Sequence, residues 1–290
     1  MLAAVAALGT GAVALAGAPV PPNDGDDAVA KAGGLRYSAD GRLADAGPVE
    51  AGCGPARWRT IGGGGGVTGT TSERSLRTLR PVDFDDADDA FDEGWSVGGI
   101  GPAGSVATAQ AICARGERIR YRVKDAPPSP AELRSANVGC GGGGFRVTAG
   151  GVRIGSADSF ISSSFPHDGG DRDRRPDDGW TGKVLDSGLA GFEVYAICVR
   201  GAVVDYRKKK PATIPTDSAL TRRVGCGKKG HAVGGGARIT DLINRGRIAD
   251  TQPYDGPDAD EAPDDGWRTT GLNLSSGAPR KLVPYAICLR

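Results

Sequence analysis

The sequence predicts an all-β protein built from three repeats. A 15-residue acidic segment recurs three times at a spacing of about 85 residues, six cysteines recur with it, and short runs of β-branched and aromatic residues lie between Gly-rich turns. Apart from a weak hint at 239–243, no stretch keeps an apolar period of 3.6 residues. We expect three tandem, disulfide-closed β-sandwich-like modules; a closed pseudo-threefold β assembly is the alternative.

The first 33 residues are expected to lie outside the modules. Residues 1–18, MLAAVAALGTGAVALAGA, resemble the apolar region and cleavage site of a secretory signal peptide, and 19–33 are expected to form a flexible leader. Because the apolar segment is rich in Ala and Gly and barely reaches spanning length, we expect no stable membrane span. The sequence therefore predicts an exported protein that is secreted or associated with the cell surface.

The repeat divides the remaining chain into β modules at residues 34–123, 124–207 and 208–290. Each module runs through a GCG tripeptide, a Gly-rich strand, the acidic loop, a Trp and a closing strand that contains AIC. A short strand around Tyr37 has counterparts around Tyr121 and Tyr206. Either each module begins with its own Tyr strand, or the N-terminal one completes the last module. The polar, Pro-containing segments 124–137 and 208–223 are expected to be linkers.

The six cysteines predict a disulfide framework. One Cys of each module lies in GCG and the other in AIC, with separations of 60, 58 and 62 residues. A pairing that repeats in every module gives Cys53–Cys113, Cys140–Cys198 and Cys226–Cys288, whereas the rival scheme joins Cys113–Cys140, Cys198–Cys226 and Cys53–Cys288. No C-x-x-C or neighbouring His completes a zinc site.

The acidic loops, residues 81–95, 166–180 and 253–267, carry the clearest functional signal. Their D-x-x-D-x-D spacing gathers hard oxygen ligands in one short turn, which suits calcium, although the loops lack the final Glu of an EF-hand. Asp and Gly also form turns without a metal, because Asp side chains accept hydrogen bonds from nearby backbone amides. The candidate calcium ligands are Asp83, Asp86, Asp88, Asp168, Asp171, Asp173, Asp177, Asp255, Asp258, Asp260 and Asp264.

A Trp closes each acidic loop: Trp95, Trp180 and Trp267. An exposed indole beside a polar loop would stack on a sugar, so these residues are candidate binding aromatics. A small disulfide-bonded module also needs large aromatic residues for its core, and this second interpretation is favoured.

The search for catalytic groups is largely negative. Aligned by repeat, the two histidines replace other residue types: His231 matches Trp58 and Phe145, and His167 matches Val82 and Tyr254. A packing role is therefore expected for His231. There is no G-x-S-x-G motif, and the carboxylates come in three copies rather than as one unique pair. We expect no enzyme; a hydrolase that uses loop carboxylates is the outside alternative.

The string C-G…G-G-G…P-x-D-G…P-D-D-G-W…Y-A-I-C resembles a repeat of secreted and surface proteins from high-GC Gram-positive bacteria. It covers nearly all of residues 34–290, and the first copy departs from it at Phe91, Asp92, Glu93 and Gln110. The resemblance implies secretion and modular β structure, and no particular chemistry.

The charge balance narrows the class of partner. A net charge of +1, from 36 basic and 35 acidic residues, does not give the basic surface of a nucleic-acid-binding protein. The sequence predicts an exported, non-catalytic surface-binding or envelope-associated protein, with a cell-surface glycan or protein as partner. A calcium-dependent carbohydrate-binding or adhesive protein is the alternative.

Overall fold

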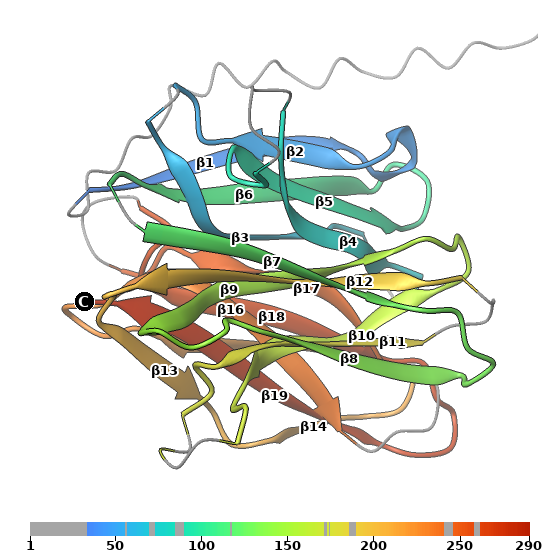
Figure 1. Cartoon of the computed structure of the whole chain (residues 1–290). Helices are drawn as coiled ribbons and strands as arrows, with labels where there is room; N and C mark the ends of the chain where they lie inside the picture. The colour runs from blue at the N-terminus through green and yellow to red at the C-terminus, as the bar shows by residue number, and fades with distance from the viewer. Residues whose placement is uncertain are drawn as a thin grey trace, which may run out of the picture.

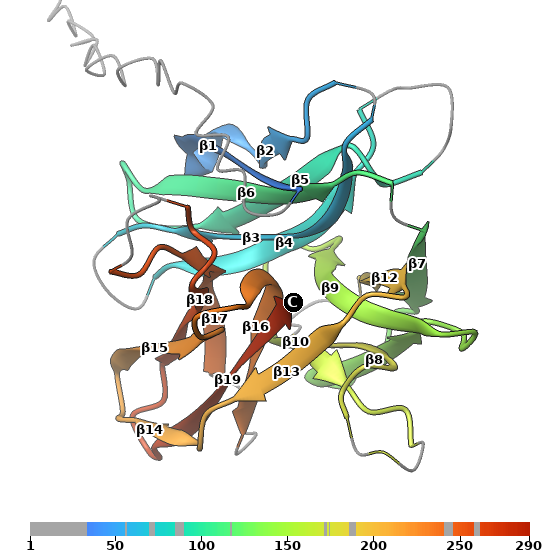
Figure 2. The ribbon, with the colours of Figure 1, turned by 90° about the vertical axis from the view of Figure 1, so that its left-hand side faces the viewer.

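The computed structural model describes residues 34–290 except 56, 70–72, 85–89, 117, 171–172, 174, 186–189, 241–245 and 258–261. The all-β prediction is confirmed: this part of the chain forms strands, one 3₁₀ helix and no α-helix. The strands belong to three open antiparallel sheets. Figure 2 shows the three repeats arranged around a central axis, with the first above and the other two below.

Each repeat supplies six main strands in the same order. The first forms β1 (Leu35–Leu43), η1 (Ala44–Ala46), β2 (Val49–Gly52), β3 (Arg59–Val67), β4 (Ser75–Val82), β5 (Gly94–Ile100) and β6 (Val106–Ala114). The second forms β7 (Arg118–Ala126), β8 (Leu133–Gly139), β9 (Phe145–Ile154), β10 (Phe160–His167), β11 (Gly179–Leu185) and β12 (Phe192–Arg200). The third forms β13 (Val204–Lys208), β14 (Ala212–Ile214), β15 (Ser218–Gly225), β16 (His231–Thr240), β17 (Gly246–Tyr254), β18 (Gly266–Asn273) and β19 (Arg280–Leu289).

Every sheet is assembled from two repeats. Sheet A has the order β1-β6-β3-β17-β18-β15, sheet B has β2-β5-β4-β9-β12-β7, and sheet C has β13-β19-β16-β10-β11-β8, with β14 also paired to β19. The first repeat therefore joins the third, the second joins the first, and the third joins the second (Figure 1). The strand order therefore gives the pseudo-threefold arrangement and not three separate tandem modules, although β1 does not complete the last repeat as that alternative supposed.

The Tyr strands start the repeats. β1 pairs with β6 of its own repeat, and Tyr37 lies beside Ile112. The expected boundaries at 123/124 and 207/208 fall inside β7 and β13, which pair with β12 and β19 of the repeats that follow. The segments expected to be linkers instead contain the edge strands β8 and β15, together with β14.

Tyrosine hydroxyls connect the repeats in a cycle. Tyr37 donates to the backbone carbonyl of Ala232 at 3.0 Å, Tyr121 to that of Thr60 at 2.8 Å, and Tyr206 to that of Val147 at 2.6 Å. Each bond runs from a Tyr strand to the Gly-rich strand of another repeat, and a hydrogen bond inside a protein contributes about 1 kcal/mol to stability. The same geometry in all three copies fixes how the repeats are placed around the axis.

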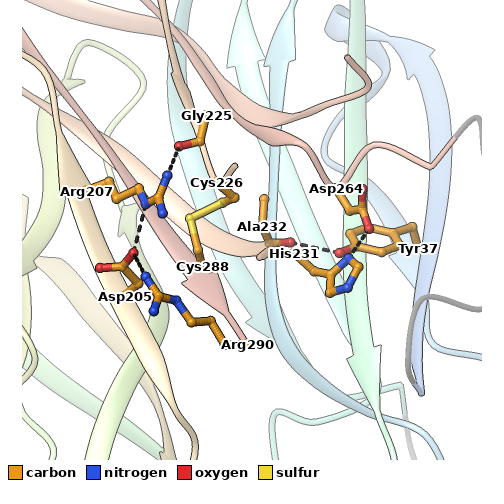
Figure 3. The surroundings of a disulfide bond; sticks show 10 residues. All are labelled: Tyr37, Asp205, Arg207, Gly225, Cys226, His231, Ala232, Asp264, Cys288 and Arg290. Carbon is orange, nitrogen blue, oxygen red and sulfur yellow. Dashed lines mark hydrogen bonds and ion pairs between the residues drawn. A yellow bond between two sulfur atoms is a disulfide. The ribbon is translucent and has the colours of Figure 1, made fainter. Parts of the chain in front are cut away.

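The predicted disulfides are present: Cys53–Cys113, Cys140–Cys198 and Cys226–Cys288. In each repeat one cysteine follows the second strand and the other lies on the closing strand, and these two strands belong to different sheets. Each disulfide therefore joins the two sheets between which its repeat is divided. Figure 3 shows Cys226–Cys288 close to the contact between Tyr37 and Ala232.

Glycine at the centre of each Gly-rich strand makes room for a tryptophan ring. A Cβ built on Gly150 would lie 2.4 Å from the ring of Trp180, and the values for Gly63 with Trp95 and Gly235 with Trp267 are 2.4 and 2.3 Å. Real Cβ contacts are not this short, and the indoles fill the core. The Gly runs are therefore required by packing.

Gly150→Ala is expected to lower the free energy of unfolding by about 1–3 kcal/mol, because the added methyl group overpacks the indole of Trp180. The matched control is Gly139→Ala, where a Cβ would meet only the carbonyl oxygen of Asp178 at 3.7 Å. Urea unfolding of both variants measures the effect. Equal stability of the two variants would contradict the packing role.

Candidate functional site

The acidic pair at the end of each loop has a structural role. The first member, Asp92, Asp177 or Asp264, is almost fully buried and contacts Arg59 at 2.9 Å, Arg146 at 3.5 Å or His231 respectively. The second member accepts a backbone N–H from the start of the same loop: Glu93 from Phe84, Asp178 from Gly169 at 2.7 Å, and Asp265 from Gly256 at 2.6 Å. These contacts tie the end of each loop to its start and to the strand beside it.

His231 has a different role from the expected one. The backbone N–H groups of Thr60, Val147 and Ala232 donate to the carbonyls of Asp92, Asp177 and Asp264, so these three donors occupy equivalent positions. His231 therefore matches Arg59 and Arg146, not Trp58 and Phe145, because the third repeat is shifted by one residue here. Figure 3 shows its Nδ1 directed at the carboxylate of Asp264. The packing interpretation of His231 was wrong.

The structure describes only part of the candidate calcium set. Asp168 accepts the backbone N–H of Gly170 at 3.0 Å, and Asp173 accepts that of Arg175 at 2.8 Å. Asp83 and Asp255 are also described, whereas Asp86, Asp88, Asp171, Asp258 and Asp260 lie outside the described residues. Among the described residues, no group of three or more His, Cys, Asp or Glu side chains could hold a metal ion. Calcium binding by the loops stays a prediction.

The three tryptophans are core residues. Trp95, Trp180 and Trp267 are 0% exposed, so no indole face is free to stack on a sugar, and their assignment as binding aromatics is corrected. Trp180 donates its N–H to Ser164 at 2.8 Å, and Trp267 donates to Thr251 at 2.7 Å. In the first repeat the equivalent strand position is Leu79, and the N–H of Trp95 has no partner among the described residues.

A polar groove of about 480 Å³ lies on the outer face of sheet A. Two cross-strand rows form much of its floor: Gln252, Arg268 and Arg223 in one, and Asp250, Thr270 and Thr221 in the other. Gly66 on β3 and Thr108 on β6 continue the second row into the other half of the sheet. The groove therefore crosses the junction between the first and third repeats.

Two residues distinguish the groove at this junction from the equivalent places in the other sheets. Where sheet A has Gly66 beside Asp250, sheet B has Arg153 beside Thr78. In sheet C, Ser164 pairs with Ala237. The neighbouring residues Ser163 and Arg238 therefore occupy the positions of Asp250 and Gly66. A Cβ on Gly66 would lie 2.8 Å from a carboxylate oxygen of Asp250, so any larger residue would displace that side chain. Glycine here leaves open the space that an Arg occupies elsewhere.

The groove is electrostatically unbalanced. Asp250, whose side chain is 14% exposed, binds Arg268 with both carboxylate oxygens, at 3.3 and 3.2 Å. Burial raises the pKa of this carboxyl, while Arg268 and Arg74 oppose the shift. Arg74 and Arg223 also line the groove, so its described lining has three guanidinium groups and one carboxylate. The arrangement suits a polar ligand with hydroxyl or anionic groups.

Reasoning from the sequence missed the groove. Its residues belong to no recognisable motif and come from five strands and a turn. The signal that could have found them is a departure from the repeat, since Gly66 aligns with Arg153 and Arg238. A comparison with protein-family models gives no match, and neither does a comparison with curated protein sequences.

The three disulfides indicate a protein located outside the cytoplasm, because such bonds persist in oxidising compartments. In the part of the chain that the structure describes, no helix has the length and apolar character needed to cross a membrane.

If the acidic loops bind calcium, the melting temperature should rise with calcium concentration, because a ligand that binds only the folded state stabilises that state. Replacing Asp168 and Asp255 by Asn should reduce this rise, whereas Asp125→Asn, outside the loops, should not. Differential scanning fluorimetry with calcium, and with magnesium as the comparison ion, measures it. A melting temperature that does not change with calcium concentration would contradict calcium binding by the loops.

His167 is expected to make the protein less stable in mild acid. Burial lowers the pKa of His167 from 6.5 in the folded state, against the opposing effect of Asp178, the backbone of Trp180 and Asp168. As the pH falls below 6.5, the unfolded chain binds a proton before the folded chain does, so stability is lost from about pH 6.5 downward through the lowered pKa.

His167→Tyr, which installs the residue of the third repeat at this position, should remove that part of the pH dependence. Urea unfolding at several pH values between about 7.5 and 5 measures it, and parallel profiles for both proteins would count against the assignment.

Proposed function

We propose that the protein is an exported, non-catalytic carbohydrate-binding protein whose ligand site is the groove on sheet A. The side-chain carbonyl of Gln252 carries this proposal. Gln252 is only 9% exposed, lines the groove, and its Oε1 has no hydrogen-bond partner among the described residues. A buried acceptor without a partner costs about 1–3 kcal/mol, and a ligand hydroxyl would satisfy it.

The other polar groups support a ligand rich in hydroxyls. Thr221 and Thr270 share a hydrogen bond of 2.8 Å between their hydroxyl oxygens, and Thr108 adds a third hydroxyl on the opposite side of Gly66. Hydroxyls both donate and accept, so they match the alternating donors and acceptors of a sugar. The volume of the groove lies within the range of small-molecule sites, about 300–1,000 Å³.

The carboxylates support binding over hydrolysis. Glycosidases need two carboxyl groups on opposite sides of the scissile bond. Asp250 is the only carboxylate among the described residues that line the groove, and Arg268 holds both of its oxygens. The buried loop acids lie outside the groove: Asp92 and Asp177 are paired with arginines and Asp264 with His231. These contacts favour orientation of a ligand over proton transfer.

Filling the groove should abolish binding without unfolding the protein. The double variant Gly66→Arg/Asp250→Ser gives sheet A the residue pair that sheet C has at Arg238 and Ser163, a combination that the fold already accommodates. We expect affinity for glycans found on an array to fall by at least about tenfold, since the variant removes charged contacts and fills the space. The unfolding midpoint should change little.

The matched control is Arg153→Gly, which alters the equivalent position of sheet B, and its affinity should equal that of the wild type. An array without any hit would contradict the proposed function, and so would binding that survives the double variant unchanged.

A further inference from the structure

We infer that the ligand of this groove carries a carboxylate, so that the chemical class bound is an acidic oligosaccharide such as one built from uronic acids. This inference rests on the proposed function and specifies its ligand. It depends on two arginines, Arg74 and Arg223, which form no ion pair with a carboxylate among the described residues, although the charge of Asp250 also acts on Arg74.

Arg74 lies just before β4, at one side of the groove. Its only described hydrogen bond is a long one, 3.4 Å from Nη1 to the carbonyl of Val67, and its Nε is buried without a partner among the described residues. Burying a guanidinium nitrogen without an acceptor is costly. An anionic oxygen in the groove would supply the acceptor.

Arg223 comes from β15, across the sheet from β3. Its guanidinium lies 5.2 Å from the centre of the Tyr254 ring, next to Arg268 in the cross-strand row. Because Asp250 already binds Arg268 with both oxygens, it is not free to neutralise Arg223 as well. Two arginines that flank a neutralised pair leave a net positive groove, and guanidinium groups recognise carboxylates with paired hydrogen bonds.

The neutral groups of the groove favour a sugar acid over an acidic peptide. The carbonyl of Gln252 needs a donor, and the hydroxyls of Thr108 and Thr221 suit groups that both donate and accept. A sugar ring presents several hydroxyls, each both donor and acceptor, beside its carboxylate, whereas the donors of an acidic peptide are backbone N–H groups that cannot also accept. The groove thus combines arginines that would bind a carboxylate with polar groups that would bind hydroxyls. A uronic acid carries both kinds of group on one ring.

The test compares trigalacturonate with its methyl ester, which has the same rings and hydroxyls and no charge. Isothermal titration calorimetry with the full chain should show the acid binding about tenfold or more tightly at low salt, in line with charged hydrogen bonds. High salt should narrow the difference because it screens partly exposed charges.

Two variants distinguish the contribution of the arginine charges from the contribution of the rest of the groove. Arg74→Gln and Arg223→Gln should each lower the affinity for the acid more than the affinity for the ester, so that the preference for the acid falls. Arg153→Gln, the same replacement on sheet B, should change neither. Circular dichroism and melting temperature check that each variant is folded, and neither Arg is part of the core.

The outcomes distinguish the inference from the proposed function. Equal binding of acid and ester, both lost in Gly66→Arg/Asp250→Ser, would overturn the charged ligand and keep the carbohydrate site. Binding of polyglutamate as tight as that of trigalacturonate would overturn the assignment to a sugar. No binding of trigalacturonate, with only neutral glycans found on the array, would overturn the inference alone, and an array without hits would overturn both.

Discussion

The structure depends on the sharing of sheets between repeats: no repeat forms a complete sheet by itself, and every sheet takes its strands from two of them. The half-sheet β1-β6-β3 ends at a strand whose free edge is covered by β17 of the third repeat, and the other two sheets follow the same rule. Direct pairing at these junctions is short; that between β3 and β17 covers only Asp250 with Gly66 and Thr251 with Gly65. The side-chain contacts at each junction therefore add to the few backbone pairs that join the repeats.

Those contacts are the Tyr hydroxyls and the tryptophan core. Since each Tyr reaches the Gly-rich strand of a different repeat, loss of one bond leaves two others in the cycle. The indoles lie against glycines within their own repeats and are fully buried. The first repeat differs, because Leu79 replaces the hydroxyl that receives the indole N–H in the other two. The packing of Trp against Gly is thus the same in all three repeats, whereas, among the described residues, the hydrogen bond of the indole N–H is formed in only two of them.

Much of this fold could be predicted from the sequence, because the repeat limits the choices. A pairing that recurs in every unit selected Cys53–Cys113 and its counterparts, and the short runs of β-branched and aromatic residues indicated strands. The edge strands β8 and β15 were missed, since one of their faces is exposed and their polar residues resemble a linker. Ring closure was also undetermined, because the residues that join repeats are single tyrosines and glycines with no local pattern.

The groove also could not be predicted from the sequence. It results from residues that differ from those of the other repeats at outward positions, while the core stays the same. Outward positions on the strands do not touch the buried tryptophans, so their side chains can vary without affecting closure. At the junction of sheet A, two changes belong together, because Asp250 would collide with any larger residue at position 66. An arginine beside a small hydroxyl residue in two sheets has become a carboxylate beside a glycine in the third. In sheet A the positive charge therefore lies on Arg74, Arg223 and Arg268 around the groove, and not on the Gly-rich strand itself. A fold closed three times by the same contacts can therefore vary the outward side chains of one sheet without disturbing its core.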